Sequence, residues 1–190
     1  MVELWIARHG ETDWNIEGRY QGQADPPLNA KGLEQAIAMR DKLSGIQFDA
    51  IYTSDLQRAR QTAAPIAERL GLPVKVDPRL REINQGEWEG QLFTTIREKY
   101  PKELADYMQN PLVSRPPGGE TIAEVAARVE AAIKDINDLY PNGRVLIISH
   151  GIALATLLSK VHDAPISQVH SLIPENAAPQ VIYWQMDATH

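Results

Sequence analysis

Two short apolar runs in this chain each end in a histidine followed by a glycine. The apolar residues 4–7 come shortly before His9, and the apolar residues 145–148 come shortly before His150. A short run of bulky apolar residues that stops near a glycine is typical of a buried strand followed by a tight turn. Ligands in open α/β sheets bind just outside the carboxyl ends of the strands. We therefore expect both histidines to line one pocket at that edge of a sheet.

Two arginines are expected at the same pocket. Arg8 directly precedes His9, and Arg58 falls one turn into a helix that Ser54 is expected to begin. Guanidinium groups bind the oxygens of a phosphate in a fixed fork geometry, and the positive end of a helix favours an anion. Gly151 would let the backbone approach a ligand closely. Because arginines repel cations, a tetrahedral dianion suits this set better than a metal ion.

The chain lacks the usual signs of a metal or cofactor site. It contains no cysteine, no HExxH sequence and no local run of carboxylates. Thiolates, paired histidines and clustered carboxylates are the ligand patterns by which such sites are recognised in a sequence. We expect neither a metal ion nor a cofactor.

The expected pocket contains both a nucleophile and a proton donor. A neutral imidazole is a nucleophile, and flanking arginines lower the pKa of a histidine, so its lone pair stays free near neutral pH. His9 is therefore the expected nucleophile in phosphoryl transfer. Glu82 lies just before an irregular segment and is the first choice for a general acid, with Glu87 as the next.

Composition indicates a soluble protein that acts on small molecules. The 190 residues are 43% hydrophobic and 23% charged, with a net charge of −6. Nucleic-acid binding needs a basic face, and a membrane span needs a long apolar run, so we expect neither partner. Glu3 and Arg8 interrupt the N-terminal segment, which argues against a signal peptide. The absence of cysteine is consistent with a reducing compartment, and we expect a cytoplasmic protein.

Strand and helix patterns alternate along the chain and indicate a single α/β domain. We expect a mostly parallel open sheet with helices on both faces. The expected strands are residues 1–8, 48–52, 74–76, 144–149 and 180–185, and the expected helices are 30–43, 54–70, 121–140 and 152–161. Ser54 and Gln57 have capping-box spacing, as do Thr121 and Glu124.

Other segments have weaker patterns. Residues 11–28 read as a long loop, and in helix 30–43 the residues expected to face inward are Leu33, Ala36, Ile37 and Leu43. Residues 84–117 are irregular, with a helical stretch near 93–108, and are expected to cap the site and set its specificity. The edge segment 72–76 is a candidate surface for pairing into a homodimer.

Several pieces of the chain together resemble the histidine phosphatase superfamily, whose members include cofactor-dependent phosphoglycerate mutases. The resemblance runs from residue 4 to about residue 177, and its pieces are residues 8–15, 18–22, 28–36, 52–63, 80–90, 117–121 and 149–151. Arg-His-Gly alone is a weak signal, but these pieces in the same order and spacing are specific.

The resemblance implies one histidine phosphatase domain over residues 1–190, with a phosphoglycerate mutase-like fold. It implies a phosphohistidine at His9 and proton donation by Glu82. The residues that match phosphate-binding positions of the family are Arg8, Asn15, Arg58 and His150. Gln21 and Gly22 match positions that contact the substrate.

One departure from the mutases favours the phosphatase branch. Mutases follow the acidic residue with an Arg-x-Tyr-Gly pattern and carry a longer basic insertion, whereas Glu82 is followed here by Ile83-Asn84-Gln85-Gly86. A mutase must hold a bisphosphorylated intermediate, which needs more cations than this loop has. We therefore expect a metal-independent phosphomonoesterase that acts on a small phosphorylated metabolite.

Other interpretations remain open from the sequence. The alternatives for function are a cofactor-dependent phosphoglycerate mutase and a catalytically silent phosphate-binding module. Phosphoserine, a sugar phosphate, α-ribazole phosphate and phosphoglycerate are all possible substrates. The site residues also have ordinary structural interpretations: a backbone-bonded strand-end histidine (His9), a helix cap (His150), solvated charges (Arg58, Glu82) and loop-stabilising amides (Asn15, Gln21).

Overall fold

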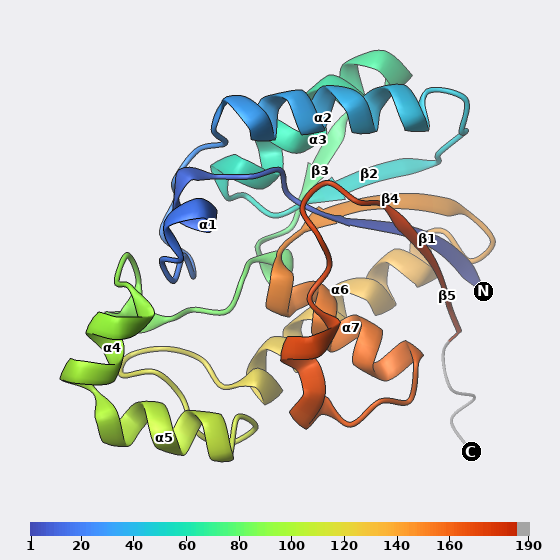
Figure 1. Cartoon of the computed structure of the whole chain (residues 1–190). Helices are drawn as coiled ribbons and strands as arrows, with labels where there is room; N and C mark the ends of the chain where they lie inside the picture. Colours follow the sequence, from blue (N-terminus) through green and yellow to red (C-terminus); the bar gives the residue numbers. More distant parts are fainter. Residues whose placement is uncertain (186–190) are drawn as a thin grey trace, which may run out of the picture.

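The computed structural model describes residues 1–185 and shows a five-stranded sheet. The strand order is β3 (Val74–Val76), β2 (Ala50–Thr53), β4 (Arg144–Ser149), β1 (Val2–Arg8) and β5 (Gln180–Trp184). The first four strands run parallel, and β5 pairs antiparallel with β1 (Figure 1). The expected single-domain, mostly parallel α/β fold is confirmed. β3 is an edge strand as expected, and its pairing with a second copy stays a prediction.

Helices cover both faces of this sheet. Helices α2 (Ala30–Leu43) and α3 (Gln57–Leu70) lie on one face, and α6 (Ile122–Leu139) and α7 (Gly151–Val161) on the other (Figure 1). Successive strand residues point to opposite faces, so each strand contributes to two cores. In β4, Leu146 packs with α2 and α3, whereas Ile147 packs with α6 and α7. This double burial explains the nearly continuous apolar runs in the strands.

The inward face of α2 differs from the expected one. Ala36 and Leu43 are buried as expected, but Leu33 and Ile37 are 48% and 42% exposed. The buried stripe instead includes Gly32 and continues through Met39. Gly32 lies on the buried face because the first turn of α2 packs against the backbone that follows β1, where no side chain fits.

Two expected boundaries near the site were wrong. The segment read as the loop 11–28 contains the short helix α1 (Asp13–Glu17), capped by Thr12 and Asn15. Helix α3 begins at Gln57 rather than at Ser54. The first backbone N–H of α3 donates to Asp25 Oδ1 over 2.6 Å, so a residue distant in sequence replaces the expected capping box.

The segment between β3 and α6 is built of short helices. It contains 3₁₀ turns at Pro78–Leu80 and Gly86–Trp88, then α4 (Phe93–Lys99) and α5 (Pro101–Gln109). In Figure 1, α1 and α4 lie on the left, the side toward which β1 runs. The capping box of Thr121 and Glu124 starts α6 as expected. A last 3₁₀ segment, Ile166–Leu172, packs on α7.

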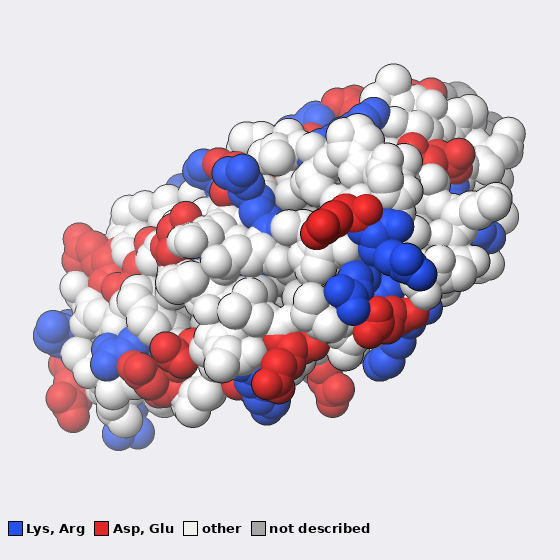
Figure 2. Space-filling model, turned by 90° about the horizontal axis from the view of Figure 1, so that it is seen from above, with Lys and Arg blue, Asp and Glu red and all other residues white. Residues whose placement is uncertain are grey.

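Among residues 1–185, no helix is long and apolar enough to cross a membrane. Figure 2 shows the face formed by α2 and α3, where acidic and basic side chains are interspersed. That face therefore lacks the basic stripe by which nucleic-acid binding is recognised.

Candidate active site

The structure brings the two predicted histidines together. Arg8 and Ser149 are register partners on the adjacent strands β1 and β4, so the residues that follow them leave the sheet side by side. The ring centroids of His9 and His150 lie 5.2 Å apart, and both side chains are buried. The structure therefore places these two residues side by side at the carboxyl ends of β1 and β4.

A close backbone approach holds the turn that carries His9. A Cβ atom on Gly10 would lie 2.5 Å from the carbonyl oxygen of Gly32, the glycine in the first turn of α2. The N–H of Gly10 donates to Thr62 Oγ1 over 3.0 Å, which ties the turn to α3. The turn is therefore fixed from two helices, and the position of the His9 ring does not depend on its own contacts alone.

Hydrogen bonds determine which nitrogen of His9 is free to react. His9 Nδ1 lies 2.7 Å from the carbonyl oxygen of Gly10. A carbonyl oxygen can only accept, so Nδ1 carries the proton and Nε2 holds the lone pair. Arg58 Nε donates to this Nε2 over 3.3 Å. The nucleophilic nitrogen is thus Nε2, directly beside a guanidinium group.

The environment keeps His9 neutral. Burial lowers its pKa well below the usual 6.5, and the charges of Arg58 and Arg8 lower it further. Both effects disfavour the imidazolium ion. The ring therefore keeps a free lone pair at neutral pH.

The guanidinium of Arg58 is fully buried and fixed by backbone. Its Nη atoms donate to the carbonyl oxygens of Gly22 and Ala24, each over 2.7 Å. Burial lowers the pKa of Arg58 to about 10, so the group stays charged at neutral pH. Arg8 donates to the carbonyl of Pro174 over 3.3 Å, while its Nε is buried without a partner in residues 1–185. Both groups offer fixed positive charge beside His9.

His150 is held by Ser54, the residue wrongly expected to cap α3. Ser54 Oγ lies 2.6 Å from His150 Nε2 and accepts the N–H of Leu56 over 3.3 Å. Either group can be the donor in this bond, because a hydroxyl both donates and accepts. Within the described residues the buried Nδ1 of His150 has no partner.

Glu82 is held at the start of α7 and is not a freely solvated acid. Its Oε1 accepts the N–H groups of Ile152 and Ala153 over 3.1 and 3.3 Å, and that of Ile83 over 2.9 Å. A Cβ atom on Gly151 would lie 3.4 Å from Glu82 Oε2 and 3.7 Å from an Arg8 nitrogen. The glycine therefore allows the carboxyl group, the helix start and Arg8 to lie close together. Glu87, the other acid considered, is exposed and accepts a bond from Tyr100.

An ion pair that the sequence analysis missed supports the Glu82 segment. Arg128 on α6 donates to the carbonyl oxygens of Arg79, Arg81 and Glu82, over 2.6 to 2.8 Å. The same guanidinium forms two bonds of 2.9 Å with the carboxylate of Glu120. Glu120 lies in one of the pieces that carry the family resemblance, but Arg128 has no local signal because the carbonyl groups that it binds lie 46 to 49 residues away along the chain.

We expect Arg128→Lys to impair the candidate active site, although the substitution keeps the positive charge at position 128. The shorter ammonium group cannot bridge three carbonyls and a carboxylate, so the backbone at Glu82 should shift. A displacement of about 1 Å in an active site can cost about 100-fold in rate. We therefore expect kcat on an alkyl phosphate to fall roughly 10- to 100-fold.

The substrate dependence separates positioning from folding. If Arg128 acts through Glu82, p-nitrophenyl phosphate, whose leaving group needs little protonation, should lose less activity. Arg115→Lys is the matched control, because Arg115 forms an exposed ion pair with Glu124. Equal losses on both substrates would contradict the positioning role.

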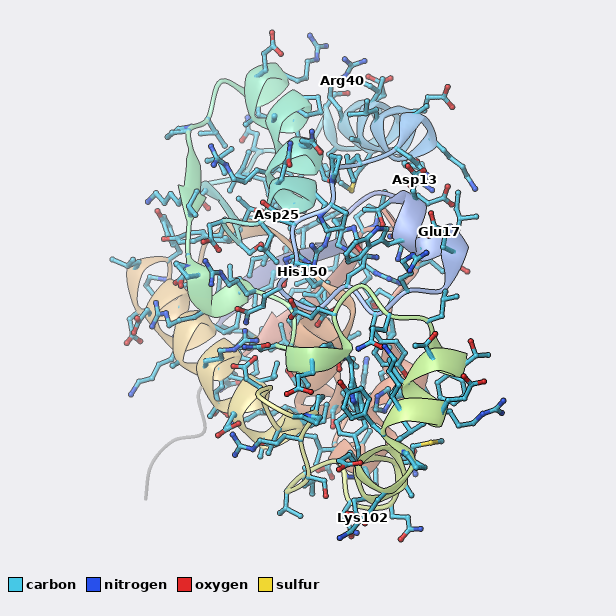
Figure 3. All side chains as sticks on the ribbon, turned by 90° about the vertical axis from the view of Figure 1, so that its left-hand side faces the viewer. Asp13, Glu17, Asp25, Arg40, Lys102 and His150 are labelled. Carbon is cyan, nitrogen blue, oxygen red and sulfur yellow. The ribbon has the colours of Figure 1, made fainter. Side chains whose placement is uncertain are left out.

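The predicted site residues surround a pocket of about 320 Å³. Its walls include the predicted residues Arg8, His9, Asn15, Gln21, Gly22, Arg58 and Glu82. His150 is fully buried beside His9 rather than exposed in the wall. In Figure 3, His150 lies near the middle of the face at which the strands end. A larger hollow of about 850 Å³ lies near the amino ends of β1 and β4, away from both histidines.

Other pocket residues were missed by the sequence analysis. They include Tyr20, Gln85, Ile152, His170 and Ile173. His170 had no motif around it, and it reaches the pocket because the 3₁₀ segment 166–172 folds back over α7. His162 is exposed, and His190 lies outside the described residues. Among residues 1–185, no three His, Asp or Glu side chains gather so as to hold a metal ion.

Comparison with known proteins agrees with this geometry. Residues 4–190 match the family model of the histidine phosphatase superfamily, branch 1. The chain belongs to the histidine phosphatase superfamily. The expected phosphatase class is confirmed, because the relatives and solved structures that the chain resembles include named phosphatases.

Relatives within the superfamily carry different names. Phosphoserine phosphatase 1 of Hydrogenobacter thermophilus is 34% identical over 97% of this chain and 88% of its own length. A probable phosphoglycerate mutase, GpmB of Escherichia coli, is 38% identical over 87% of this chain and 77% of its own length. A mycobacterial glucosyl-3-phosphoglycerate phosphatase, solved with VO3, has a TM-score of 0.86 and 32% identity, covering 96% of this chain and 92% of its own. The superfamily is thus clear, whereas these names do not agree on one substrate.

Proposed function

We propose that this protein is a metal-independent phosphomonoesterase that hydrolyses a small phosphorylated metabolite through a phosphohistidine. The observation that carries the proposal is His9, a buried neutral imidazole whose Nδ1 is occupied by the Gly10 carbonyl and whose Nε2 lies 3.3 Å from Arg58 Nε. A fixed tautomer beside a permanent cation suits attack on a phosphoryl group.

The reaction has two steps on one nitrogen. In the first, His9 Nε2 forms a bond to phosphorus, the ester P–O bond breaks, and Glu82 donates a proton to the departing alkoxide. In the second, water attacks the phosphorus, Glu82 takes a proton from that water, and the N–P bond breaks to release phosphate. Each step leaves Glu82 in the state that the next step needs.

The other predicted residues bind the phosphoryl group or the substrate. Arg8 and Arg58 provide charge, and we assign His150, whose buried Nδ1 has no partner within residues 1–185, to donate to a phosphoryl oxygen. Asn15 Oδ1 accepts the N–H of Thr12 over 3.0 Å, which orients the amide at the pocket wall and leaves its NH₂ group to donate. We assign Gln21, Gly22 and the close-packed Gly151 to the substrate-binding surface, and residues 84–117 to a cap that sets specificity.

Two observations favour hydrolysis over mutase activity. Arg97, Lys99 and Lys102 are the first lysines and arginines after Glu82, and all three are exposed on α4 and α5. Lys102 lies far from His150 in Figure 3. Asn84 uses its side-chain oxygen to accept the N–H of Gly86 over 2.8 Å. The loop after Glu82 therefore adds no cation that would retain a second phosphate or a carboxylate.

We expect release of free phosphate to exceed isomerisation. The protein is incubated with 3-phosphoglycerate and a trace of 2,3-bisphosphoglycerate, and 2-phosphoglycerate is measured against phosphate. In parallel, p-nitrophenyl phosphate is hydrolysed with and without EDTA, and the two rates should be equal.

Three outcomes would contradict the proposal. Isomerisation faster than phosphate release from the best ester would indicate a mutase. Loss of activity in EDTA would indicate a metal, and absence of phosphate release from every ester would favour a silent binding module.

A further inference from the structure

The pocket has a wall that takes no part in binding the phosphoryl group. This leaving-group wall consists of Tyr20, Gln21, Gln85 and His170, which line the pocket beside the phosphate-binding arginines. These side chains come from the segment after α1, from the 3₁₀ turn before α4 and from the 3₁₀ segment after α7. An alcohol esterified to a phosphate at His9 would lie in the same pocket as this wall.

Two side chains of the wall contain unpaired hydrogen-bonding atoms. Gln21 and Gln85 line the pocket, and their Oε1 atoms are buried without a partner within residues 1–185. Gln85 is only 8% exposed. A buried amide oxygen without a partner costs free energy, so turning either amide toward a hydroxyl group in the pocket would gain a missing hydrogen bond.

Negative charge lies behind the same wall. The half-buried carboxylate of Glu89 accepts the N–H groups of Gln23 and Gln85, over 2.7 and 3.1 Å. The left-handed turn at Gly22 (φ 52°) packs directly on this carboxylate. Glu82 adds a second acidic group inside the pocket. The carboxylate of Glu89 repels an anionic leaving group, whereas Glu82 carries the proton of the general acid while the ester is bound.

Within residues 1–185, no positive charge on this side is free to compensate a carboxylate. Arg19 lines the pocket, but its guanidinium is bound to Glu17 and donates to the carbonyl of Gly90 over 2.8 Å. Burial lowers the pKa of His170 below its usual value, although Glu82 raises it, so the net shift disfavours the imidazolium ion. Arg8 and Arg58 lie beside His9, where the phosphoryl group needs them.

We infer that the leaving group accepted by this pocket is an uncharged, hydroxyl-bearing alcohol, as in polyol and sugar phosphates, in preference to one that bears a carboxylate. The inference rests on the proposed phosphatase function and specifies its substrate class. A carboxylate on this wall would lose its hydration without gaining a cation, whereas hydroxyl groups would donate to the two amide oxygens.

A matched pair of substrates tests the inference. Glycerol 3-phosphate and 3-phosphoglycerate share the same carbon skeleton and differ in a CH₂OH group against a carboxylate. We expect kcat/KM to be higher for glycerol 3-phosphate by about 10-fold or more, which lies at the low end of the discrimination that pocket contacts produce. Equal values, or a preference for 3-phosphoglycerate, would overturn the inference.

Variants of Gln85 locate the preference in the wall. Gln85→Arg supplies a cation, and the ratio of kcat/KM for glycerol 3-phosphate to that for 3-phosphoglycerate should fall about 10-fold. Gln85→Leu removes the amide, and the ratio of kcat/KM for glycerol 3-phosphate to that for p-nitrophenyl phosphate should fall by a similar factor. Ratios are read within one variant, so a general loss of folded protein does not affect them.

A matched control comes from Gln47. Its side chain is exposed and lies at the larger hollow near the amino ends of β1 and β4, away from the pocket. Gln47→Leu should leave both ratios unchanged, and equal effects at Gln85 and Gln47 would overturn the inference. Hydrolysis of p-nitrophenyl phosphate separates the two proposals. If p-nitrophenyl phosphate is hydrolysed but esters that bear a carboxylate are preferred, only the inferred substrate class is wrong. If no ester is hydrolysed, the proposed phosphatase function is wrong.

Discussion

His9→Ala should abolish turnover of every phosphomonoester, with a loss of at least about 10⁴-fold, as is usual when a covalent nucleophile is removed. Arg8, Arg58 and His150 would still bind phosphate, but no nitrogen would remain to accept the phosphoryl group. The fold should persist, because the bond from Gly10 to Thr62 and the Gly10–Gly32 contact hold the turn without the imidazole.

The intermediate should form on one nitrogen. Because Nδ1 donates to the Gly10 carbonyl, the acid-labile phosphoryl group should be found on His9 Nε2 after rapid quenching, identified by ³¹P NMR and by peptide mapping. His162→Ala is the control, since that imidazole is exposed. A phosphoryl group trapped on another residue would overturn the assignment, and so would full activity of His9→Ala.

Glu82→Gln should slow hydrolysis according to the leaving group. On an alkyl phosphate such as glycerol 3-phosphate we expect a loss of about 10²–10⁴-fold, the usual contribution of general acid catalysis. On p-nitrophenyl phosphate the loss should be much smaller, because the phenolate departs without a proton. The glutamine oxygen can still accept the N–H groups of Ile152 and Ala153, so the start of α7 should stay in place.

The comparison between substrates makes this test specific. Glu87→Gln changes the same atoms on an exposed side chain and should leave both rates near those of the unchanged protein. If Glu82→Gln reduces the hydrolysis rates of both substrates by the same factor, Glu82 supports binding or folding. The proton must then come from another group.

Helix and strand ends that are set by residues nearby in the sequence could be predicted from the sequence. Apolar runs that end in His-Gly placed His9 and His150 at strand ends, and parallel strands bring their carboxyl ends to one edge of the sheet. The capping box at Thr121 likewise fixed the start of α6 correctly. Alternation of strands and helices was enough to predict a single α/β domain with a mostly parallel sheet.

Other predictions failed where a distant residue replaced a local partner. Ser54 and Gln57 have the spacing of a capping box, but Asp25 accepts the N–H of Gln57, and Ser54 bonds to His150 across 96 residues of chain. In α2, Leu33 and Ile37 fit an apolar stripe, yet the close approach at Gly32 turns them toward solvent. Local spacing cannot show which of two available partners is nearer in space.

The finer properties of the site depend on tertiary contacts. The tautomer of His9, the Arg128–Glu120 pair that supports Glu82, and the unpaired amides of Gln21 and Gln85 have no signature in short stretches of sequence. Local hydrogen bonding and apolar periodicity specify helices, strands and their ends, because those depend on residues a few positions apart. The charge and hydrogen-bonding character of the pocket arises from side chains that only folding brings together, since burial and distance set the strength of every charge in it.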